Sequence, residues 1–302
     1  MLAEPTPSPL TGKRNVTLVE TRSARQLIAS WQAEYQIDIS KELQGIPEIF
    51  KYRCNDTSLG FFTPQNAAGS EWLYEQLQQI PWYYQKDKWE YRVARNELRQ
   101  CKAILEIGCG TGEFLKLLKA DGHEAMGSEL NRRAVSQARA IGLEVSDEEL
   151  GTFRESEFDA ACSFQVLEHV TDPAAFIRSI TKLVKPGGKI AFAVPNSSAF
   201  TGFGYDILQY PPHHMSWWTA ESFRSLCSLF PIRLEKILVE PLAAEHIDIY
   251  AKWNLRHWQE RFQHFHWILN DKTLRIYRRL LQQTSFRRWC IGHSLYAQFI
   301  KL

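Results

Sequence analysis

The sequence predicts an α/β fold built on a mostly parallel sheet, and two observations carry this prediction. Short apolar segments alternate with helical patterns from residue 103 to residue 240. The apolar segment 103–107 also runs directly into the glycine-rich loop G-C-G-T-G at 108–112, and a helical pattern follows from Glu113. This order predicts a ligand cradle, because glycines let the backbone approach a ligand and a helix N-terminus favours a negatively charged group.

Composition limits the class of protein. The 302 residues, 44% of them hydrophobic, suffice for one large domain or two small ones. A net charge of +2 gives no general basic field, so we expect no nucleic-acid partner. We find no apolar run near 18 residues and no signal-peptide pattern, and we therefore expect no transmembrane segment and a cytoplasmic protein. Six scattered cysteines without a C-x-x-C pair predict free thiols and no metal.

The spacing of the glycine loop decides between cofactors. A dinucleotide fingerprint would need a third glycine at position 113, where the chain has Glu113, and no G-K-[ST] follows for a P-loop. The stretch instead resembles motif I of the class I S-adenosylmethionine (SAM) methyltransferases, E-x-G-x-G-x-G, at Glu106, Gly108, Gly110 and Gly112. The resemblance implies a seven-stranded Rossmann-like sheet of order 3-2-1-4-5-7-6, with SAM as cofactor and S-adenosylhomocysteine (SAH) as product.

The resemblance and the pattern together divide the chain into five parts. We expect a disordered tail at 1–14, an N-terminal lid or substrate module at 15–90, the SAM-binding core at 91–240, a helical insertion at 241–293 and the last core strand at 294–302. The N-terminal module should hold a helix that starts behind a serine cap at Ser23 and a hairpin over 51–64. Its aromatic cluster either packs on the core or covers SAM, with Tyr84 and Trp89 as the candidates for a lid.

The core elements follow in order. Strands are predicted at 123–129, 143–145, 158–164, 185–196, 232–240 and 294–300, and helices at 132–141 and after the Asp172–Pro173 cap. Glu129 ends the second strand, where a carboxylate can accept hydrogen bonds from ribose hydroxyls. Q-V-L-E-H-V from Gln165 resembles the segment that passes beneath SAM in this family. The expected cofactor-binding residues are Glu106, Gly108, Cys109, Gly110, Gly112, Glu129, Leu130, Phe164, Gln165, Tyr84 and Trp89.

Three histidines are candidates for catalysis. The stretch Y-P-P-H-H-M-S-W-W-T at 210–219 precedes a helix capped by Thr219 and lies where α/β folds place ligand sites. His213 and His214 either remove a proton from the acceptor or hold their loop by bonding carbonyl oxygens. His169 has the same two alternatives, a structural bond or a position facing the acceptor.

The insertion differs from the rest of the chain in charge. Residues 241–302 carry ten lysines and arginines against four acids, a balance of +6 that leaves −4 for the remainder. One helix face is predicted from Leu255, Trp258, Phe262, Phe265 and Leu269, and a second from Leu274, Tyr277 and Leu281. The insertion either meets an anionic or amphipathic acceptor or packs on the core with a solvated basic face.

These observations predict a methyltransferase acting on a small-molecule, sugar or lipid-linked acceptor, with oxygen favoured over carbon or nitrogen. The segment V-P-N at 194–196 is not the [DN]-P-P-[YFW] signature of base-amine methyltransferases, which disfavours nucleobase methylation. A SAM-binding protein without turnover and an RNA or protein methyltransferase are the alternatives. The oligomeric state is left open by the sequence.

Overall fold

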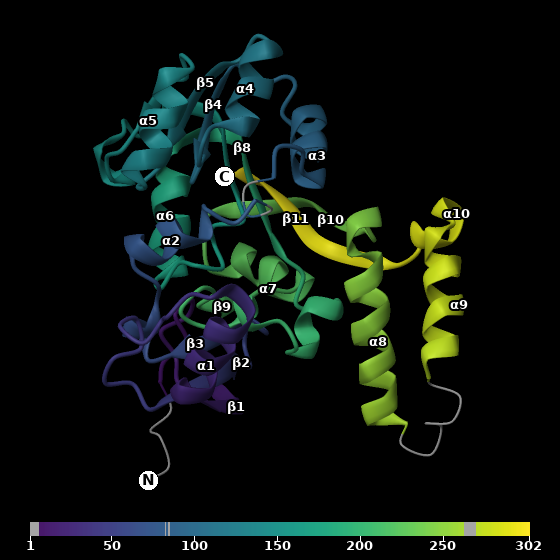
Figure 1. Ribbon diagram of the computed structural model, residues 1–302. Coiled ribbons are helices and arrows are strands. Elements are labelled where there is room, and N and C mark those ends of the chain that lie inside the picture. Colours follow the sequence, from purple (N-terminus) through teal and green to yellow (C-terminus); the bar gives the residue numbers. More distant parts are fainter. Residues whose placement is uncertain (1–5, 82, 84, 263–269) are drawn as a thin grey trace.

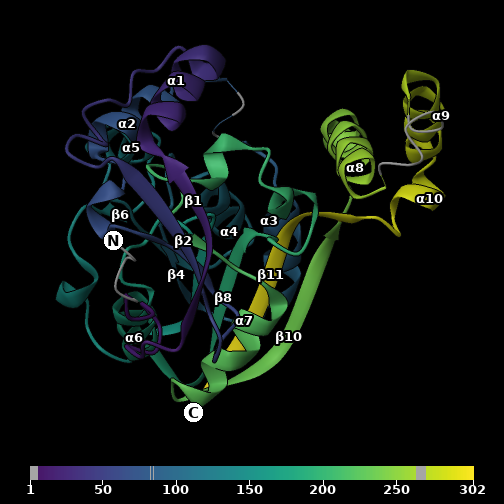
Figure 2. The same cartoon turned by 90° about the horizontal axis from the view of Figure 1, so that it is seen from below.

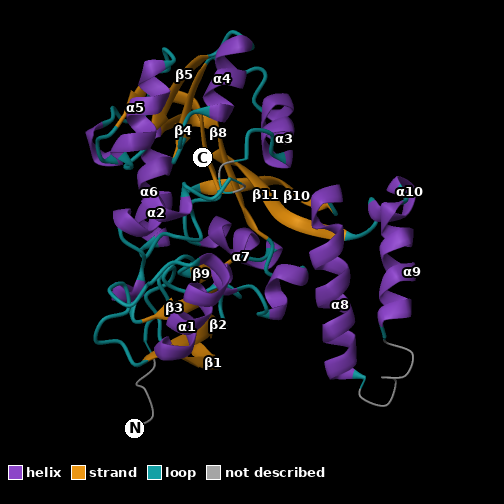
Figure 3. Cartoon of the chain, viewed as in Figure 1, coloured by secondary structure: helices purple, strands orange, loops and turns teal. Residues whose placement is uncertain are grey.

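A seven-stranded sheet forms the centre of the molecule (Figures 1 and 3). The computed structural model describes residues 6–81, 83, 85–262 and 270–302. The order β10-β11-β8-β7-β4-β5-β6 is the predicted 3-2-1-4-5-7-6 read from the other edge. Only β11 runs antiparallel to both of its neighbours, β8 and β10. The strands are β4 Ala103–Ile107, β5 Glu124–Ser128, β6 Val145–Ser146, β7 Phe158–Phe164, β8 Val184–Pro195, β10 Ile232–Pro241 and β11 Ile291–Lys301.

Two helices of the core begin at the capping residues that the sequence predicts. Asp172 accepts a hydrogen bond from the Ala175 N–H and precedes a proline at N1, and Thr219 forms a capping box with Ser222. Ser23, in contrast, precedes its helix without a side-chain cap bond, so that expected cap is wrong. The core helices are α3 Trp89–Glu97, α4 Glu113–Ala120, α5 Arg132–Ala140, α6 Pro173–Leu183 and α7 Ala220–Ser225.

Alternate residues of the central strands face two different hydrophobic cores. Leu105 and Ala161 belong to the core that includes residues of α6 and α7, whereas Ile104 and Ala160 belong to the core that includes residues of α3, α4 and α5. This alternation is the two-residue period of a strand buried on both faces. The sheet is therefore covered on both sides, and its strand ends are left to form a site.

The N-terminal module is built on a second sheet that the sequence only partly predicted. β2 Glu48–Cys54 and β3 Gly60–Thr63 form the expected hairpin, and β1 Val16–Ser23, which was not predicted, pairs with β2. The fourth strand, β9 Ser216–Trp217, comes from the segment after the paired histidines. The boundary expected at residue 90 is therefore crossed by strand pairing. Helices α1 Ala24–Tyr35 and α2 Glu71–Leu77 complete the module.

The tail expected to be disordered is packed over most of its length. Residues 1–5 lie outside the described residues. Ser8 and Leu10 are buried, and the Gly12 N–H donates to the Ser8 carbonyl oxygen at 2.8 Å. The expected disorder of 1–14 is wrong for residues 6–14, because Leu10 joins the core around Tyr52 and Leu59.

The insertion forms a helical arm that projects away from both sheets (Figures 1 and 2). It contains α8 Ile247–Arg261, α9 Asp271–Gln282 and the short α10 Thr284–Arg287. The first predicted helix face is too long, because α8 ends at Arg261 and leaves Phe262 beyond it. Phe265 and Leu269 lie outside the described residues.

A buried carboxyl group near the base of the arm predicts a pH dependence of stability. Burial raises the pKa of Glu240 to about 7, while its carboxylate accepts a hydrogen bond from the Ser294 N–H at 3.0 Å. Because the folded-state pKa is raised, the stabilisation is complete below about pH 4.5 and is lost as the pH rises through about 7. At pH 8 the free energy of unfolding of Glu240→Gln should therefore exceed that of the native protein by about 1 to 3 kcal/mol. At pH 4.5 the two free energies should be nearly equal.

Urea unfolding at both pH values measures this difference. The exposed Glu221→Gln is the matched control. An equal stability difference at pH 4.5 and pH 8 for Glu240→Gln would contradict the assignment.

Candidate active site

The glycine loop after β4 has a conformation that only glycine adopts easily. Gly108, Gly110 and Gly112 have φ angles of 72°, 53° and 82°. A Cβ on Gly108 would lie 2.3 Å from Val166 Cγ2, and one on Gly112 would lie 2.3 Å from Leu143 Cδ1. The loop is therefore held tightly between the segment after β7 and the segment before β6.

Two side chains of the motif point into the protein rather than out of the loop. Cys109 is buried, and a Cβ on Gly127 would lie 2.5 Å from its Sγ, so the thiol packs onto β5. Only the backbone of Cys109 is therefore available to a cofactor. Glu106 is 2% exposed, and its Oε2 has no hydrogen-bond partner among the described residues. Burial raises the pKa of Glu106 well above its ordinary value.

Glu129 lies where the sequence placed it, directly after β5. Its Oε2 accepts a hydrogen bond from the Gly110 N–H at 2.9 Å, and its Oε1 accepts one from the Asn131 N–H at 2.8 Å. Each carboxylate oxygen can accept a further bond. Leu130 beside it is 70% exposed. A charged acceptor and an open apolar side chain thus stand next to the glycine loop.

The end of β7 supplies the other side of the candidate cofactor site. Phe164 is buried in an aromatic cluster with Phe114 at 5.2 Å between ring centroids. Gln165 has a φ of 57° and donates from Nε2 to Glu90 Oε1 at 3.1 Å. Trp89 is partly buried against the same core. Tyr84 lies outside the described residues.

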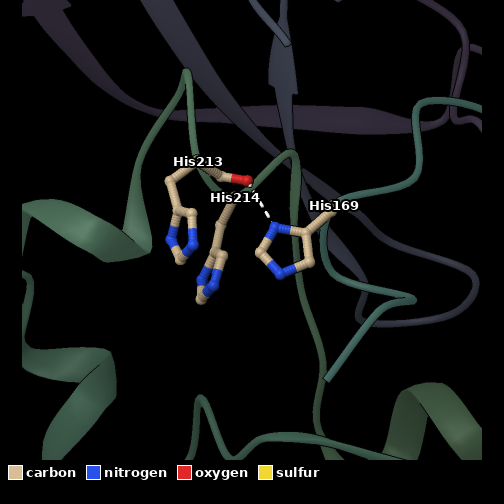
Figure 4. A group of neighbouring side chains, drawn as sticks. All are labelled: His169, His213 and His214. Carbon is tan, nitrogen blue, oxygen red and sulfur yellow. Dashed lines mark hydrogen bonds between the residues drawn. The ribbon is translucent and has the colours of Figure 1, made fainter. Parts of the chain in front are cut away.

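The three candidate histidines come together although His169 lies 44 residues before His213 in the chain (Figure 4). The ring centroid of His169 is 4.6 Å from that of His213 and 4.8 Å from that of His214. Each ring also forms a hydrogen bond to an oxygen through Nδ1. His169 bonds the His213 carbonyl oxygen at 2.6 Å, and His213 bonds the Leu208 carbonyl oxygen at 3.0 Å. His214 bonds Gln209 Oε1 at 3.3 Å. The loop-holding alternative of the sequence analysis is therefore present in all three rings, and a catalytic role stays a prediction.

Burial sets the charge of this cluster. It lowers the pKa of His169 to about 4 and those of His213 and His214 well below their ordinary values. The three rings are therefore neutral near pH 7. The cluster is linked to the glycine loop along the chain, because Val166 contacts Gly108 and His169 follows three residues later.

Two residues of this site were missed by the sequence analysis. Glu168 is 2% exposed, and its Oε1 lies 3.9 Å from His169 Nε2. Its place directly before His169 in the hexapeptide Q-V-L-E-H-V was a signal, because a carboxyl group close to a histidine changes the pKa of the imidazole. Tyr83 bonds His213 Nε2 at 3.0 Å through its hydroxyl, a contact across 130 residues that no local pattern predicts.

A glycine loop after the first parallel strand, a carboxylate at the end of the second and the observed strand order define a class I SAM-dependent methyltransferase. The chain belongs to the methyltransferase domain family, whose match spans residues 81–291, more than two thirds of the chain. SAM is the cofactor of this class. The orphaned Glu106 oxygen and the glycine loop fit it, since its methionine half carries an ammonium group that a buried carboxylate can bind.

The curated relatives agree with this class. The chain is 33% identical over 120 residues to the ubiquinone biosynthesis O-methyltransferase of Alkalilimnicola ehrlichii, covering 35% of this chain and 49% of that protein. It is 33% identical over 125 residues to the protein of that name in Aromatoleum aromaticum, covering 38% and 53%. The chain thus spans about half the length of these relatives. A solved SAM-dependent methyltransferase from Archaeoglobus fulgidus is 17% identical, with a TM-score of 0.48 over 76% of this chain and all of that one.

Across the described ranges, no helix has both the length and the apolar character needed to cross a membrane.

The position of Glu129 predicts its effect on cofactor affinity. Glu129→Ala should weaken SAH binding by about 1.5 to 3 kcal/mol, because a charged acceptor for the ribose hydroxyls is lost. Isothermal titration with SAH measures this loss, and an SAH analogue without ribose hydroxyls should bind both proteins alike. Because Glu129 also holds the Gly110 N–H, Glu129→Gln serves as the matched variant that keeps one acceptor. Equal SAH affinity in the native and alanine proteins would remove Glu129 from the cofactor site.

Proposed function

We propose that this protein transfers a methyl group from SAM to a hydroxyl group of a small-molecule, sugar or lipid-linked acceptor. One observation carries the proposal. The Gly108–Val166 contact sets the glycine loop against the segment that also carries His169, which supports a site shared by the loop and the histidine cluster. The names of the partly matching relatives support oxygen as the acceptor atom.

Different proposed cofactor residues would bind the methionine half, the ribose and the adenine of SAM. Glu106 and the backbone of 108–112 would bind the methionine half, Glu129 the ribose, and Leu130 would cover one face of the adenine. When bound, SAM supplies a methyl group on a positively charged sulfur, which is already activated for displacement. The protein's share is then to orient the acceptor and exclude water. Phe164, Gln165, Trp89 and Tyr84 are proposed to close the site around the methionine half.

The histidine cluster is proposed to handle the acceptor's proton. Nδ1 of each ring donates its proton in a hydrogen bond to an oxygen, so the lone pair lies on Nε2. Nε2 is then the nitrogen that can accept a hydrogen bond from a hydroxyl. His213 Nε2 already bonds Tyr83, which leaves His169 and His214 as the stronger candidates. Their fixed orientation would align the hydroxyl oxygen for attack while its proton passes to nitrogen.

The helical arm is proposed to shape the acceptor site. Its base packs on Phe200, whose ring lies 5.3 Å from that of Tyr250 and which follows the C-terminal end of β8. The cofactor residues lie at the same edge of the sheet, after β4, β5 and β7. The arm's net positive charge and exposed apolar side chains such as Trp289, 85% exposed, suit an anionic or amphipathic acceptor.

Methyl transfer from radiolabelled SAM tests the proposal. The purified protein is incubated with a fractionated metabolite and lipid extract, and in parallel with total RNA and a protein mixture. We expect label in an organic-soluble or small-molecule fraction, stable to base as an ether is. Label in RNA or protein would favour the macromolecular alternative, and SAM binding without any transfer would favour a non-catalytic protein.

A further inference from the structure

The histidine cluster has the spacing of a set of metal ligands. One ring nitrogen from each of His169, His213 and His214 lies within 4.8 Å of the others (Figure 4). In a tetrahedral zinc site with Zn–N bonds near 2.0 Å, the nitrogens would be about 3.4 Å apart. The three donors are therefore close to the separation that one ion requires. The donors come from two loops, one after β7 and one before β9, that are already joined by the hydrogen bonds of the Met215 and Ser216 N–H groups to the Glu168 carbonyl oxygen.

The outer hydrogen bonds prepare these rings for a metal. Every Nδ1 in the cluster bonds a carbonyl oxygen, which accepts only, so each Nδ1 carries the proton and each Nε2 carries the lone pair. Histidines that bind metals are held in this way, with the second ring nitrogen donating to an oxygen that fixes the tautomer.

An independent observation points to a cation beside these rings. Glu168 is 2% exposed, and its Oε2 has no hydrogen-bond partner among the described residues. Its Oε1 lies 3.9 Å from His169 Nε2, on the side of the ring opposite the Nδ1 bond. A buried carboxylate oxygen without a partner is costly. A cation at the Nε2 atoms would give this carboxylate a partner.

We propose that His169, His213 and His214 bind one divalent transition-metal ion through Nε2, with the Glu168 carboxylate beside it. Three imidazole nitrogens suit zinc and its neighbours, and not magnesium or calcium, which take oxygen ligands. The Tyr83 hydroxyl, 3.0 Å from His213 Nε2, has to give way to the ion. This replaces the expectation of no metal.

A metal here would change how the acceptor is activated. An ion with three histidine ligands keeps a position open for an oxygen and lowers the pKa of the hydroxyl bound there. This role rests on the proposed O-methylation, whereas the binding of the ion does not. The histidines would then hold the ion, and the acceptor hydroxyl would lose its proton more readily than it would to a neutral imidazole alone.

Cobalt binding tests the site without SAM or acceptor. The full-length protein is stripped with a chelator and titrated with Co²⁺, whose visible absorption is strong in tetrahedral nitrogen sites. We expect one equivalent to bind, with the absorption bleached by one equivalent of Zn²⁺. His169→Ala and His214→Ala should each weaken binding by more than about 100-fold, since loss of even an outer partner costs 10- to 100-fold. His123→Ala, which removes a histidine bonded to the Cys101 carbonyl oxygen, should bind as the native protein does.

Folding of each variant is checked by its thermal stabilisation with SAH. Tyr83→Phe removes the competing hydroxyl and should bind Co²⁺ at least as tightly as the native protein. The proposal is overturned if the native protein binds no stoichiometric Co²⁺, or if folded His169→Ala and His214→Ala bind it equally well. Either result leaves the proposed O-methylation standing, whereas a Co²⁺-loaded protein that methylates no acceptor would count against the proposed function alone.

Discussion

Methyl transfer by His214→Ala is expected to fall by about 100-fold or more, while the affinity for SAM stays the same. His214 is 4% exposed, and its Nδ1 bonds Gln209 Oε1, so Nε2 is the nitrogen that we propose for the acceptor's proton. The cofactor residues lie on other segments, after β4 and β5. Loss of the ring should therefore reduce the rate of the chemical step and leave the cradle intact. Single-turnover transfer and SAH titration measure the two effects separately.

His169→Ala should show the same separation, because its ring lies 4.8 Å from that of His214. His213→Ala is expected to have the smaller effect on chemistry, since both of its ring nitrogens are already bonded, to Leu208 and to Tyr83. His123→Ala, near the start of β5, is the matched control. Normal transfer by folded His214→Ala and His169→Ala would make the cluster structural and would remove it from the acceptor site.

The core sheet could be predicted because its signals are local. Each strand is a short apolar run, and caps such as Asp172 and Thr219 act within three residues of their helices. The predicted strand at 143–145 shifted only to Val145–Ser146. The order of the strands came from the resemblance to a family and not from the residues themselves.

The N-terminal sheet could not be predicted because its pairing is distant in sequence. β3 pairs with β9 through Gly60 and Trp217, and a Cβ on Gly60 would lie 3.0 Å from the Trp217 Cβ. Nothing near residue 60 indicates this partner. The exposed β1 carries few apolar residues on a repeating face, and the pattern of burial in Val16–Ser23 shows no clear alternation.

The candidate site also has parts that the sequence could predict and parts that it could not. The glycine loop and Glu129 were predictable, because a turn and a strand end show in contiguous residues. The histidines were predicted singly, but their common cluster depends on two loops meeting across the sheet edge. The free Glu168 oxygen depends on burial, which the sequence does not show.

Excision of the helical arm is expected to abolish most transfer to the native acceptor while SAM binding persists. Replacing residues 245–291 with a short turn should rejoin β10 and β11, since Val239 still pairs with Leu295. The cut removes Tyr250 and Trp253 from Phe200, at the edge of the sheet where the cofactor residues lie. If the basic arm steers an anionic acceptor, kcat/KM should fall by about 10- to 1000-fold, the range of electrostatic steering.

The intact protein allows a second test of whether the basic arm steers an anionic acceptor. Salt shortens the range of exposed charges, so KM for the native acceptor should rise with ionic strength. Reversing the charges at Arg287 and Arg288 should mimic high salt, because neither side chain joins an ion pair among the described residues. Reversing Arg256 is the contrasting variant, since it already pairs with Glu260 at 3.0 Å. Full activity after excision, or a KM that does not change with salt, would mean that the arm packs on Phe200 for stability and that the acceptor binds elsewhere.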